Sequence, residues 1–177
     1  MEGYLANPYV GVVIPLGLGF LSGVPSAQTV KQLWPHLVKP WFAPPRMAFP
    51  IVWTGLYVAM GYASSLIARA ATTHSLSETR RLARWGLGLY GAQLFLNVIW
   101  MPTFWVARRF DLAMLNISSL WLTIAGTIGV FYKVDRKAAY WMLPYLGWVS
   151  LASALNWSIW KNNPEFNKGK QLTNKRN

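Results

Sequence analysis

The sequence predicts an all-α integral membrane protein that folds as a bundle of five transmembrane helices. The first observation is composition: the 177 residues are 54% hydrophobic and only 12% charged, about half the charged share of an ordinary soluble domain. The second is the distribution of charge, because five long runs contain no Asp, Glu, Lys or Arg. A helix of about 20 mostly apolar residues crosses the hydrocarbon core of a bilayer. Each run is long enough, so we predict one transmembrane helix in each.

The five predicted helices follow one another over nearly the whole chain. The first covers residues 7–30; it lacks a preceding basic segment and is too long for the apolar part of a signal peptide, so we expect it to be retained. The others cover residues 47–68, 85–107, 112–132 and 138–160. Residues 1–163 then form one membrane domain with a lid-like connection at 31–46. Residues 164–177 form a basic polar tail that we expect to be disordered.

The connections between the helices carry the net charge of +12. Basic residues beside transmembrane helices suit anionic lipid headgroups, and no connection is long enough to fold into a basic nucleic-acid-binding face. We therefore expect the lipid bilayer, and no nucleic acid, as a partner. The connections on the N-terminal side hold seven Lys and Arg and those on the other side hold ten, which favours a cytosolic C-terminus by the positive-inside rule.

Reactive groups are scarce. The chain has no Cys, its histidines His36 and His74 lie in different connections, and its five carboxylates show no ligand spacing. No Ser-His-Asp or phosphate-loop pattern appears. We therefore expect no metal site, no obligatory cofactor and no catalytic residue of the usual acid–base or nucleophilic kind.

Neutral polar and aromatic residues recur at helical spacing inside the runs. These stripes comprise Trp53 and Tyr57 in the second run, Tyr90, Gln93, Asn97, Trp100 and Phe104 in the third, Asn116, Ser119, Thr123 and Thr127 in the fourth, and Tyr145, Trp148, Ala152, Leu155 and Asn156 in the fifth. Amides are costly in hydrocarbon unless they find partners, so Gln93, Asn97, Asn116 and Asn156 should point inward. Either these amides only join helix to helix, or a ligand lies among them.

A pocket is expected because wide rings face small residues. Trp53, Trp100 and Trp148 cannot all pack around one axis, and Gly23, Ser119 and Ala152 would lie opposite them. Ring-walled pockets suit flat, mostly apolar ligands. Small-residue pairs also occur at Gly19-x-x-x-Gly23 and Gly88-x-x-x-Ala92; they predict close helix packing, either within the chain or in a homodimer.

Three blocks of sequence resemble the translocator protein family, which includes the peripheral benzodiazepine receptor of mitochondria and the tryptophan-rich sensory protein of bacteria. They read KPWFAPPR (residues 39–46, followed by Trp53 and Tyr57), LGLYGAQLFLNVIWMPTF (87–104) and LPYLGWVSLASALNWSIWKNN (143–163). The resemblance implies a five-helix protein, commonly a homodimer, in the mitochondrial outer membrane or a bacterial membrane. It also implies a cavity that binds porphyrins such as protoporphyrin IX and benzodiazepine-type drugs.

The resemblance assigns residues to that cavity. Trp53 and Trp148 match tryptophans proposed to contact porphyrin and to mediate its light-driven breakdown. The drug-site positions are Gly23, Phe49, Pro50, Val52, Leu112, Leu115, Ser119, Ala152 and Leu155, to which the stripes add Tyr57 and Asn97. Pro50, Leu112 and Leu115 depart from the vertebrate pattern, so the pocket should have a different shape.

Two further segments follow from the resemblance. The connection with Trp41 and Phe42 is expected to lie over the pocket mouth, with Lys39 and Arg46 pairing with ligand carboxylates; otherwise it is an interfacial turn with snorkelling cations. The sterol motif of the family falls on Leu155, Trp157 and Lys161, with Trp157 in place of the usual tyrosine.

We therefore expect a membrane receptor or carrier that binds a porphyrin for sensing, sequestration or transport, in the mitochondrial outer membrane. The alternatives are sterol binding and transport, light-dependent protoporphyrin degradation, a scaffold with a filled core, and residence in another organelle or a bacterial membrane.

Overall fold

The computed structural model describes residues 2–167, and within them the chain is helical, without strands. A short α1 (Glu2–Leu5) precedes five long helices of 25 to 27 residues, and three short 3-10 or π segments lie between or after them. The long helices are α2 (Pro8–Leu33), α3 (Ala48–Thr73), α4 (Ser77–Met101), α5 (Phe110–Val134) and α6 (Arg136–Asn162), and the short ones are η1 (Trp34–His36), η2 (Pro102–Val106) and η3 (Pro164–Phe166). This confirms the all-α prediction.

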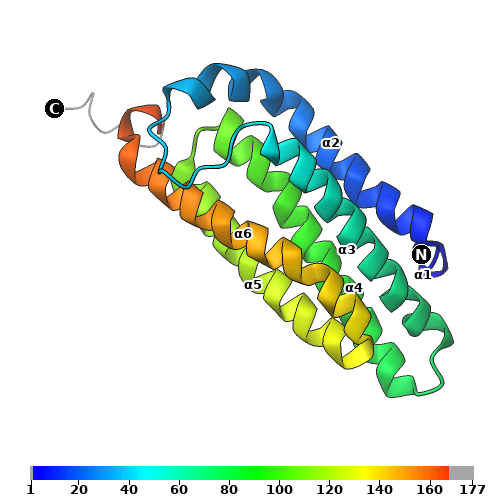
Figure 1. Cartoon of the computed structure of the whole chain (residues 1–177). Helices are drawn as coiled ribbons and strands as arrows, with labels where there is room; N and C mark the ends of the chain where they lie inside the picture. The colour runs from blue at the N-terminus through cyan, green and yellow to red at the C-terminus, as the bar shows by residue number, and fades with distance from the viewer. Residues whose placement is uncertain (1, 168–177) are drawn as a thin grey trace.

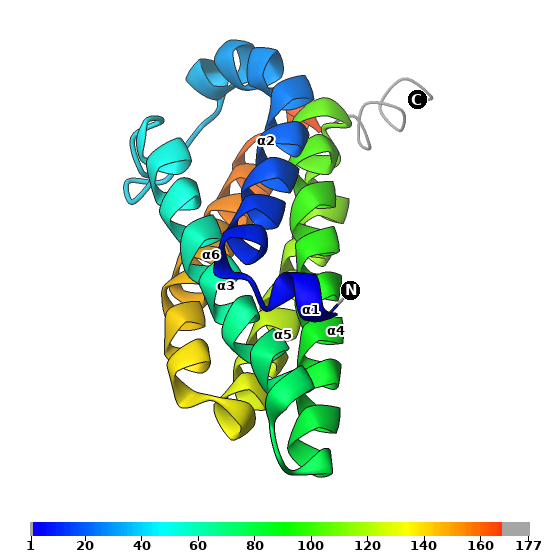
Figure 2. The same ribbon diagram turned by 90° about the vertical axis from the view of Figure 1, so that its right-hand side faces the viewer.

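Helices α3 to α6 form an antiparallel four-helix bundle, and α2 lies outside it against α3 and α4 (Figure 1). The turned view shows α2 passing along the bundle between α3 and α4, with α5 and α6 on the far side (Figure 2). Short turns explain the up-and-down order of neighbours. The α2–α3 and α4–α5 connections lie at one end of the molecule, and the N-terminus with the α3–α4 and α5–α6 turns lies at the other.

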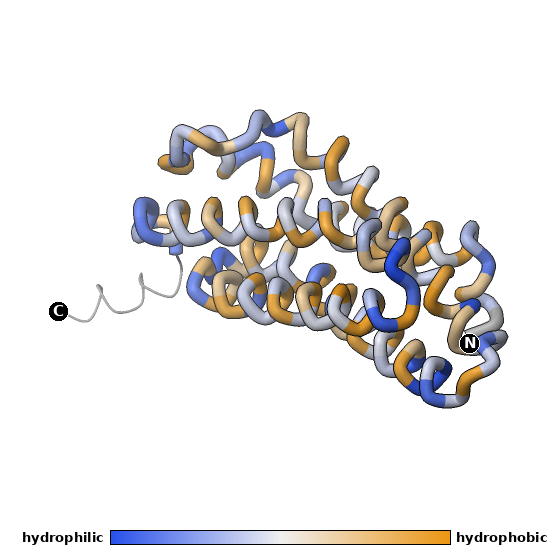
Figure 3. The backbone as a smooth tube through the Cα atoms, turned by 60° about the horizontal axis from the view of Figure 1, so that its bottom comes forward, coloured by the Kyte–Doolittle hydropathy of each residue, from blue (hydrophilic) through white to orange (hydrophobic). Residues whose placement is uncertain are grey.

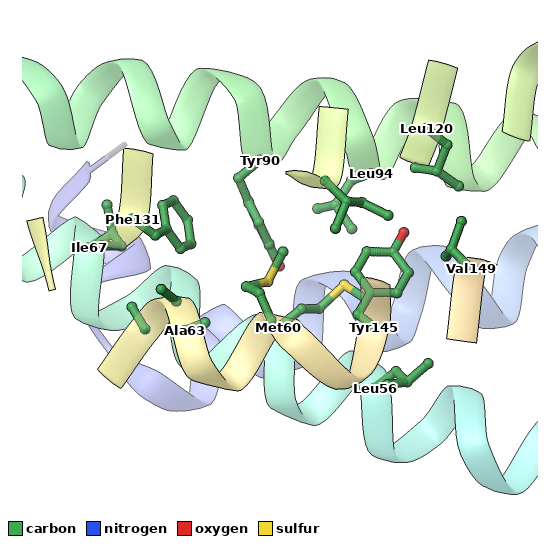
Figure 4. Packing of buried hydrophobic residues seen from close by; sticks show 14 of the residues in the cluster. Leu56, Met60, Ala63, Ile67, Tyr90, Leu94, Leu120, Phe131, Tyr145 and Val149 are labelled. Carbon is green, nitrogen blue, oxygen red and sulfur yellow. The ribbon is translucent and has the colours of Figure 1, made fainter. Parts of the chain in front are cut away.

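The core of the four-helix part is made of apolar and aromatic side chains from all four helices (Figure 4). Met60 of α3, Phe131 of α5 and Tyr145 of α6 are almost completely buried there. Large apolar side chains are also exposed on the long helices, among them Phe95, Leu122 and Leu143, and Figure 3 shows that hydrophobic residues recur along the helices. An apolar exterior over helices of this length is what a bilayer requires.

A glycine contact brings α2 against α3. A Cβ added to Gly61 would lie 2.4 Å from the Gly11 carbonyl oxygen, and one added to Gly11 would lie 2.7 Å from the Gly61 oxygen. Only residues without side chains allow the two backbones to approach this closely. Further along α2, Gly19 packs on the Tyr57 ring, so the first small-residue pair is used, at Gly19, for packing within the chain.

Several helices extend beyond the predicted spans. Helix α3 continues to Thr73 and α4 begins at Ser77, so the predicted connection 69–84 shrinks to residues 74–76. The predicted spans stopped at the first charged residue, whereas a helix continues into water when its charged side chains are solvated. Likewise the first three residues of the predicted lid-like connection belong to α2.

The junction of α4 and α5 departs from regular helix geometry. Pro102 begins a π-helical turn in which Ala107 N donates to the Pro102 carbonyl at 2.9 Å, and Arg108 has a φ of 52°. Arg109 then pairs with Asp111 at 2.8 Å, and this hydrogen bond raises the pKa of Arg109. π-turns of this kind are frequent beside functional sites.

Hydropathy alone selects three of the long helices as candidate membrane spans within the described part of the chain: the segments Pro8–His36, Ala48–Thr73 and Phe110–Val134. Helices α4 and α6 are as long, but they carry the Trp, Tyr and amide residues that hydropathy scales treat as polar. At about 1.5 Å per residue each of the five exceeds the hydrocarbon thickness of about 30 Å.

The polar tail begins with a short helical turn. Residues 164–166 form η3, Phe166 packs on the aromatic cluster around Phe104, and Asn167 is buried. A helical turn therefore follows directly after residue 163. The rest of the predicted disordered tail, residues 168–177, lies outside the described residues.

Candidate ligand-binding cavity

A cavity of about 890 Å³ lies between α2 and the bundle. It is lined by residues 13–31 of α2, 46–57 at the start of α3, 97–105 at the end of α4 with η2, and 148–159 of α6, with a small contribution from α5. All these segments except part of α2 lie in the half of the molecule that contains the α2–α3 connection. The volume falls in the range of about 300–1,000 Å³ typical of ligand pockets.

Nine aromatic rings line the cavity. The rings that line the cavity belong to Phe20, Trp34, Phe49, Trp53, Tyr57, Trp100, Phe104, Trp105 and Trp148. Several of these rings pack against one another. The centroid of the Phe49 ring lies 5.5 Å from that of Trp34 and 5.7 Å from that of Trp148, both edge to face. The Trp100 ring stacks on Phe104 with the two centroids 5.0 Å apart. Rings held in this way present fixed flat surfaces to a ligand.

Small residues keep the cavity open. Gly17 and Gly23 line it, and a Cβ added to either would meet no atom within 4 Å. Ala152 of α6 also lines the wall. The predicted contrast between wide rings and small residues is present for Gly23 and Ala152.

Polar groups lie inside the cavity and behind it. Tyr57 donates to Asn97 Oδ1 at 3.0 Å, and Asn97 Nδ2 donates to the Tyr145 hydroxyl at 3.0 Å. Gln93, Asn97 and Asn156 are buried, as predicted, and so is the Asn116 Oδ1 atom. The amides thus point inward, and one of them, Asn97, joins three helices.

Two cations line the cavity at the end near the connection. These are Lys31 in the last turn of α2 and Arg46 just before α3. Among the described lining residues there is no carboxylate. The cavity is therefore positive at that end and neutral elsewhere.

Most of the predicted ligand-binding residues meet in this cavity. Those that line it are Gly23, Phe49, Pro50, Trp53, Tyr57, Asn97, Trp148, Ala152 and Leu155. Four others do not line it: Val52, Leu112, Leu115 and Ser119. Leu112 and Leu115 lie on the outer side of α5, where Leu115 is 67% exposed. That helix instead presents Ile117 and Leu120 to the cavity, so the family positions on α5 do not reach the wall.

The predicted lid is brought to the cavity only in part. Arg46 lines the wall, but Trp41 is 96% exposed and packs edge to face on Phe42 instead of lying over the mouth. Lys39 turns back, because its Nζ donates to the carbonyls of Trp34 and Leu37 at 2.8 Å. Trp34 lines the cavity near this connection, and sequence reasoning missed it.

The sterol-motif residues do not share a surface. Leu155 is buried and lines the cavity, whereas Trp157 is half-exposed, packs edge to face on Trp160 and lies under the Lys161 ammonium. Residues two apart lie about 200° apart around a helix, so Leu155 and Trp157 face opposite ways.

Sequence reasoning missed several wall residues. Lys31 and Trp34 were assigned to the connection, and Phe20 and Met101 to no site, yet all four line the cavity. For Lys31 a signal existed: it lies eight residues after Gly23, near the same helix face. No cluster of His, Asp or Glu suited to a metal occurs in the part of the chain that the structure describes.

Comparison with known proteins agrees with this architecture. A sequence model of the TspO/MBR family matches residues 11–161. The chain is 33% identical to the tryptophan-rich sensory protein of Cereibacter sphaeroides over 159 residues, covering 85% of this chain and 94% of that protein. It is 32% identical to the translocator protein of Homo sapiens over 166 residues, covering 93% and 95%. The protein CrtK of Rhodobacter capsulatus is 35% identical over 128 residues, covering 72% and 76%.

Proposed function

The chain belongs to the TspO/MBR family of membrane proteins, and on that premise we propose that it is a membrane receptor or carrier for a flat, largely apolar ligand. We propose a porphyrin, such as protoporphyrin IX, as that ligand, held for sensing, sequestration or transport. We propose that this ligand is bound reversibly and is not an obligatory cofactor.

One observation carries the proposal: a ring-walled cavity of about 890 Å³ with two cations at one end. A tetrapyrrole has a flat apolar ring and carboxylates along one edge. The ring would lie between Phe49, Trp53 and Trp148, and the carboxylates would lie beside Lys31 and Arg46. This pairing uses Lys31 in place of Lys39, whose ammonium already has two carbonyl partners.

The setting we propose follows from the same features. We propose that all five long helices cross the bilayer, with exposed apolar side chains such as Phe95, Leu122 and Leu143 against lipid. The end with the α2–α3 connection carries more Lys and Arg in the sequence, and we assign that end, with the C-terminus, to the cytosol. We propose the mitochondrial outer membrane, with a bacterial or other organelle membrane as the alternative, and a homodimer formed through the exposed small residues Gly88 and Ala92 of α4.

The experiment that tests the ligand is quenching of tryptophan fluorescence by protoporphyrin IX in purified protein. Saturable quenching in the micromolar range, weakened in Trp53→Phe and Trp148→Phe and unchanged in Trp157→Phe, would support the proposal. Quenching that rises linearly, as in empty detergent micelles, would overturn it.

A second candidate is light-dependent porphyrin degradation, favoured by two indole rings that both line the cavity. The centroid of the Trp53 ring lies 5.4 Å from that of Tyr57 and 6.0 Å from that of Tyr145. Illuminating bound protoporphyrin IX tests it: photobleaching lost in the Phe variants while binding persists would favour an enzyme-like role. Sterol transport is tested by competition between cholesterol and porphyrin.

A further inference from the structure

The Asn163 side chain joins the α2–α3 connection to the C-terminal end of α6. Its Oδ1 accepts from the Val38 N–H at 2.7 Å, and its Nδ2 donates to the Val38 carbonyl at 3.0 Å. Asn163 is completely buried, with 0% exposure. Figure 1 shows the connection passing the end of α6, although the two segments lie far apart in the sequence.

These two hydrogen bonds exceed what the end of a helix needs. Asn163 lies directly after α6, and its Nδ2 also donates to the Ile159 carbonyl at 2.9 Å. That third bond satisfies one of the carbonyls that a helix leaves without a partner at its C-terminus. Pairing with both backbone groups of Val38 adds nothing to this cap. It fixes the connection instead, because the N–H and the carbonyl of one residue are both held.

The connection is held at two adjacent residues. Leu37 is 3% exposed and belongs to the apolar cluster that contains Leu155 and Ile159. The Val38 side chain is 56% exposed. Leu37 is therefore held through its side chain, and Val38 through its backbone by Asn163.

Both ends of the connection lie in the cavity wall. Trp34, four residues before Val38, lines the cavity, and so does Arg46 at the other end. The Trp34 ring packs on Phe49 and Trp105, with centroid distances of 5.5 and 6.1 Å. Because Trp34 and Val38 are so close in the chain, a shift of the connection at Val38 would move the part of the wall that Trp34 forms.

We infer that Asn163 is a positioning residue for ligand exchange. It holds the connection, and with it Trp34, against the bundle, and so slows the entry and release of a ligand at this end of the cavity. When the pair with Val38 is broken, the connection separates from α6 more often and the ligand exchanges faster. The inference rests on the proposed function, because it needs a ligand that occupies the cavity.

The rate of porphyrin release tests this role in protein reconstituted in lipid vesicles. Protein loaded with protoporphyrin IX is mixed with a large excess of protein-free vesicles, and the recovery of tryptophan fluorescence gives the dissociation rate. Asn163→Ala removes both hydrogen bonds to Val38. We expect the rate to rise about tenfold, as for the loss of one or two hydrogen bonds.

The neighbouring amide provides a matched control. Asn162 is exposed, and its Nδ2 donates to Ser158 Oγ at 3.2 Å within α6. Asn162→Ala should therefore leave the release rate unchanged.

Hydrogen exchange shows whether the connection itself is released. Mass spectrometry of peptides covering residues 36–43 should show faster amide exchange in Asn163→Ala than in the unmutated protein, and no change in Asn162→Ala. A residue with a merely structural role would lower the Tm and the fraction of protein that binds. It would not change the release rate of the protein that remains folded.

A second variant breaks the same contact from the other partner. Val38→Pro removes the N–H that donates to Asn163, and Leu37 already has the extended backbone, with ψ of 136°, that precedes a proline. Val38→Pro alone should raise the release rate. Adding Asn163→Ala should raise it little further, because both changes act on one contact. Val38→Ala keeps the N–H and is the control. This variant decides the test if Asn163→Ala fails to fold.

The outcomes separate the role of Asn163 from the proposed function. An unchanged release rate in both Asn163→Ala and Val38→Pro overturns the role, and so does a faster rate without faster exchange of the connection. An equal rise in Asn162→Ala also overturns it. In each case saturable quenching in the unmutated protein leaves the proposed function intact. If protoporphyrin IX does not bind saturably to the unmutated protein, both are overturned.

Discussion

The Tyr57 hydroxyl donates a 3.0 Å hydrogen bond to Asn97 Oδ1, which ties α3 to α4 beside the cavity. Asn97 in turn donates to the hydroxyl of Tyr145 on α6 at 3.0 Å. A single amide thus connects three helices where water is scarce. The same amide lines the cavity, so its hydrogen bonds also hold one part of the wall in place.

Replacing this amide should loosen the bundle. Asn97→Leu keeps the size of the side chain but leaves the buried Tyr145 hydroxyl and the part-buried Tyr57 hydroxyl without their partner, at a cost of about 1–3 kcal/mol. Thermal unfolding in detergent, followed by circular dichroism, should show a lower Tm than the unmutated protein. Asn162→Leu, at an exposed position of α6, is the control. An unchanged Tm for Asn97→Leu would mean that the two hydroxyls find other partners.

A second prediction concerns the glycine contact between α2 and α3. Gly61→Ala places a methyl group 2.4 Å from the Gly11 carbonyl oxygen, so the two helices must separate, and overpacking of this kind costs about 1–3 kcal/mol. The Tm should fall accordingly. Gly55→Ala on the same helix meets no atom within 4 Å and should leave the Tm unchanged or raise it, because Ala favours a helix. Equal behaviour of the two variants would contradict the contact.

A third prediction uses the empty space at Gly23. Leu in place of Gly23 points into the cavity, where an added Cβ meets nothing within 4 Å. The variant should keep its Tm and lose at least about tenfold in porphyrin affinity, measured by fluorescence quenching, because the side chain occupies ligand volume. Gly126→Leu, exposed on α5 and equally open, is the matched control. Full affinity in Gly23→Leu would exclude this cavity as the binding site.

The fourth prediction concerns the cations at the cavity mouth. Lys31→Gln and Arg46→Gln should each lower the affinity for protoporphyrin IX about two- to fivefold, which is the range expected for the loss of one exposed ion pair. Neither should affect the uncharged dimethyl ester of the same porphyrin. Lys39→Gln should have little effect, because that ammonium is bound to two backbone carbonyls. If only Lys39→Gln lowered the affinity, Lys31 and Arg46 would not bind the porphyrin carboxylates. Lys39, in the predicted lid-like connection, would then be the residue that binds them.

The five long helices could be predicted because their signal is local. Charge cannot stay in hydrocarbon without a partner, so uncharged runs mark the helices, and the polar stripe containing Gln93 and Asn97 marks the inward face. Both residues are buried in the structure. The helix ends could not be predicted this way, since α3 and α4 continue past the first charged residues at Arg69 and Arg84 into solvated turns.

The cavity wall was predicted less completely, for a physical reason. Spacing shows which residues share a face of a helix but not which neighbour that face meets. On α5 the family positions Leu112 and Leu115 lie outside, and Ile117 lies inside. In the connection, Trp41 and Lys39 turn away because of contacts with Phe42 and with backbone carbonyls, which no local pattern encodes.

The sequence by itself determined the number of long helices, their order and the inward direction of the amides, because the cost of placing charge and unpaired polar groups in hydrocarbon acts on each segment separately. Only the tertiary structure decided where the cavity lies. Helix α2 meets α3 where Gly11 contacts Gly61, and further along α2 Gly23 lines the cavity with no atom within 4 Å of an added Cβ. That arrangement depends on contacts between segments far apart in the chain, and it brings Lys31 to the same cavity as Arg46 and Trp100 to the same cavity as Asn156.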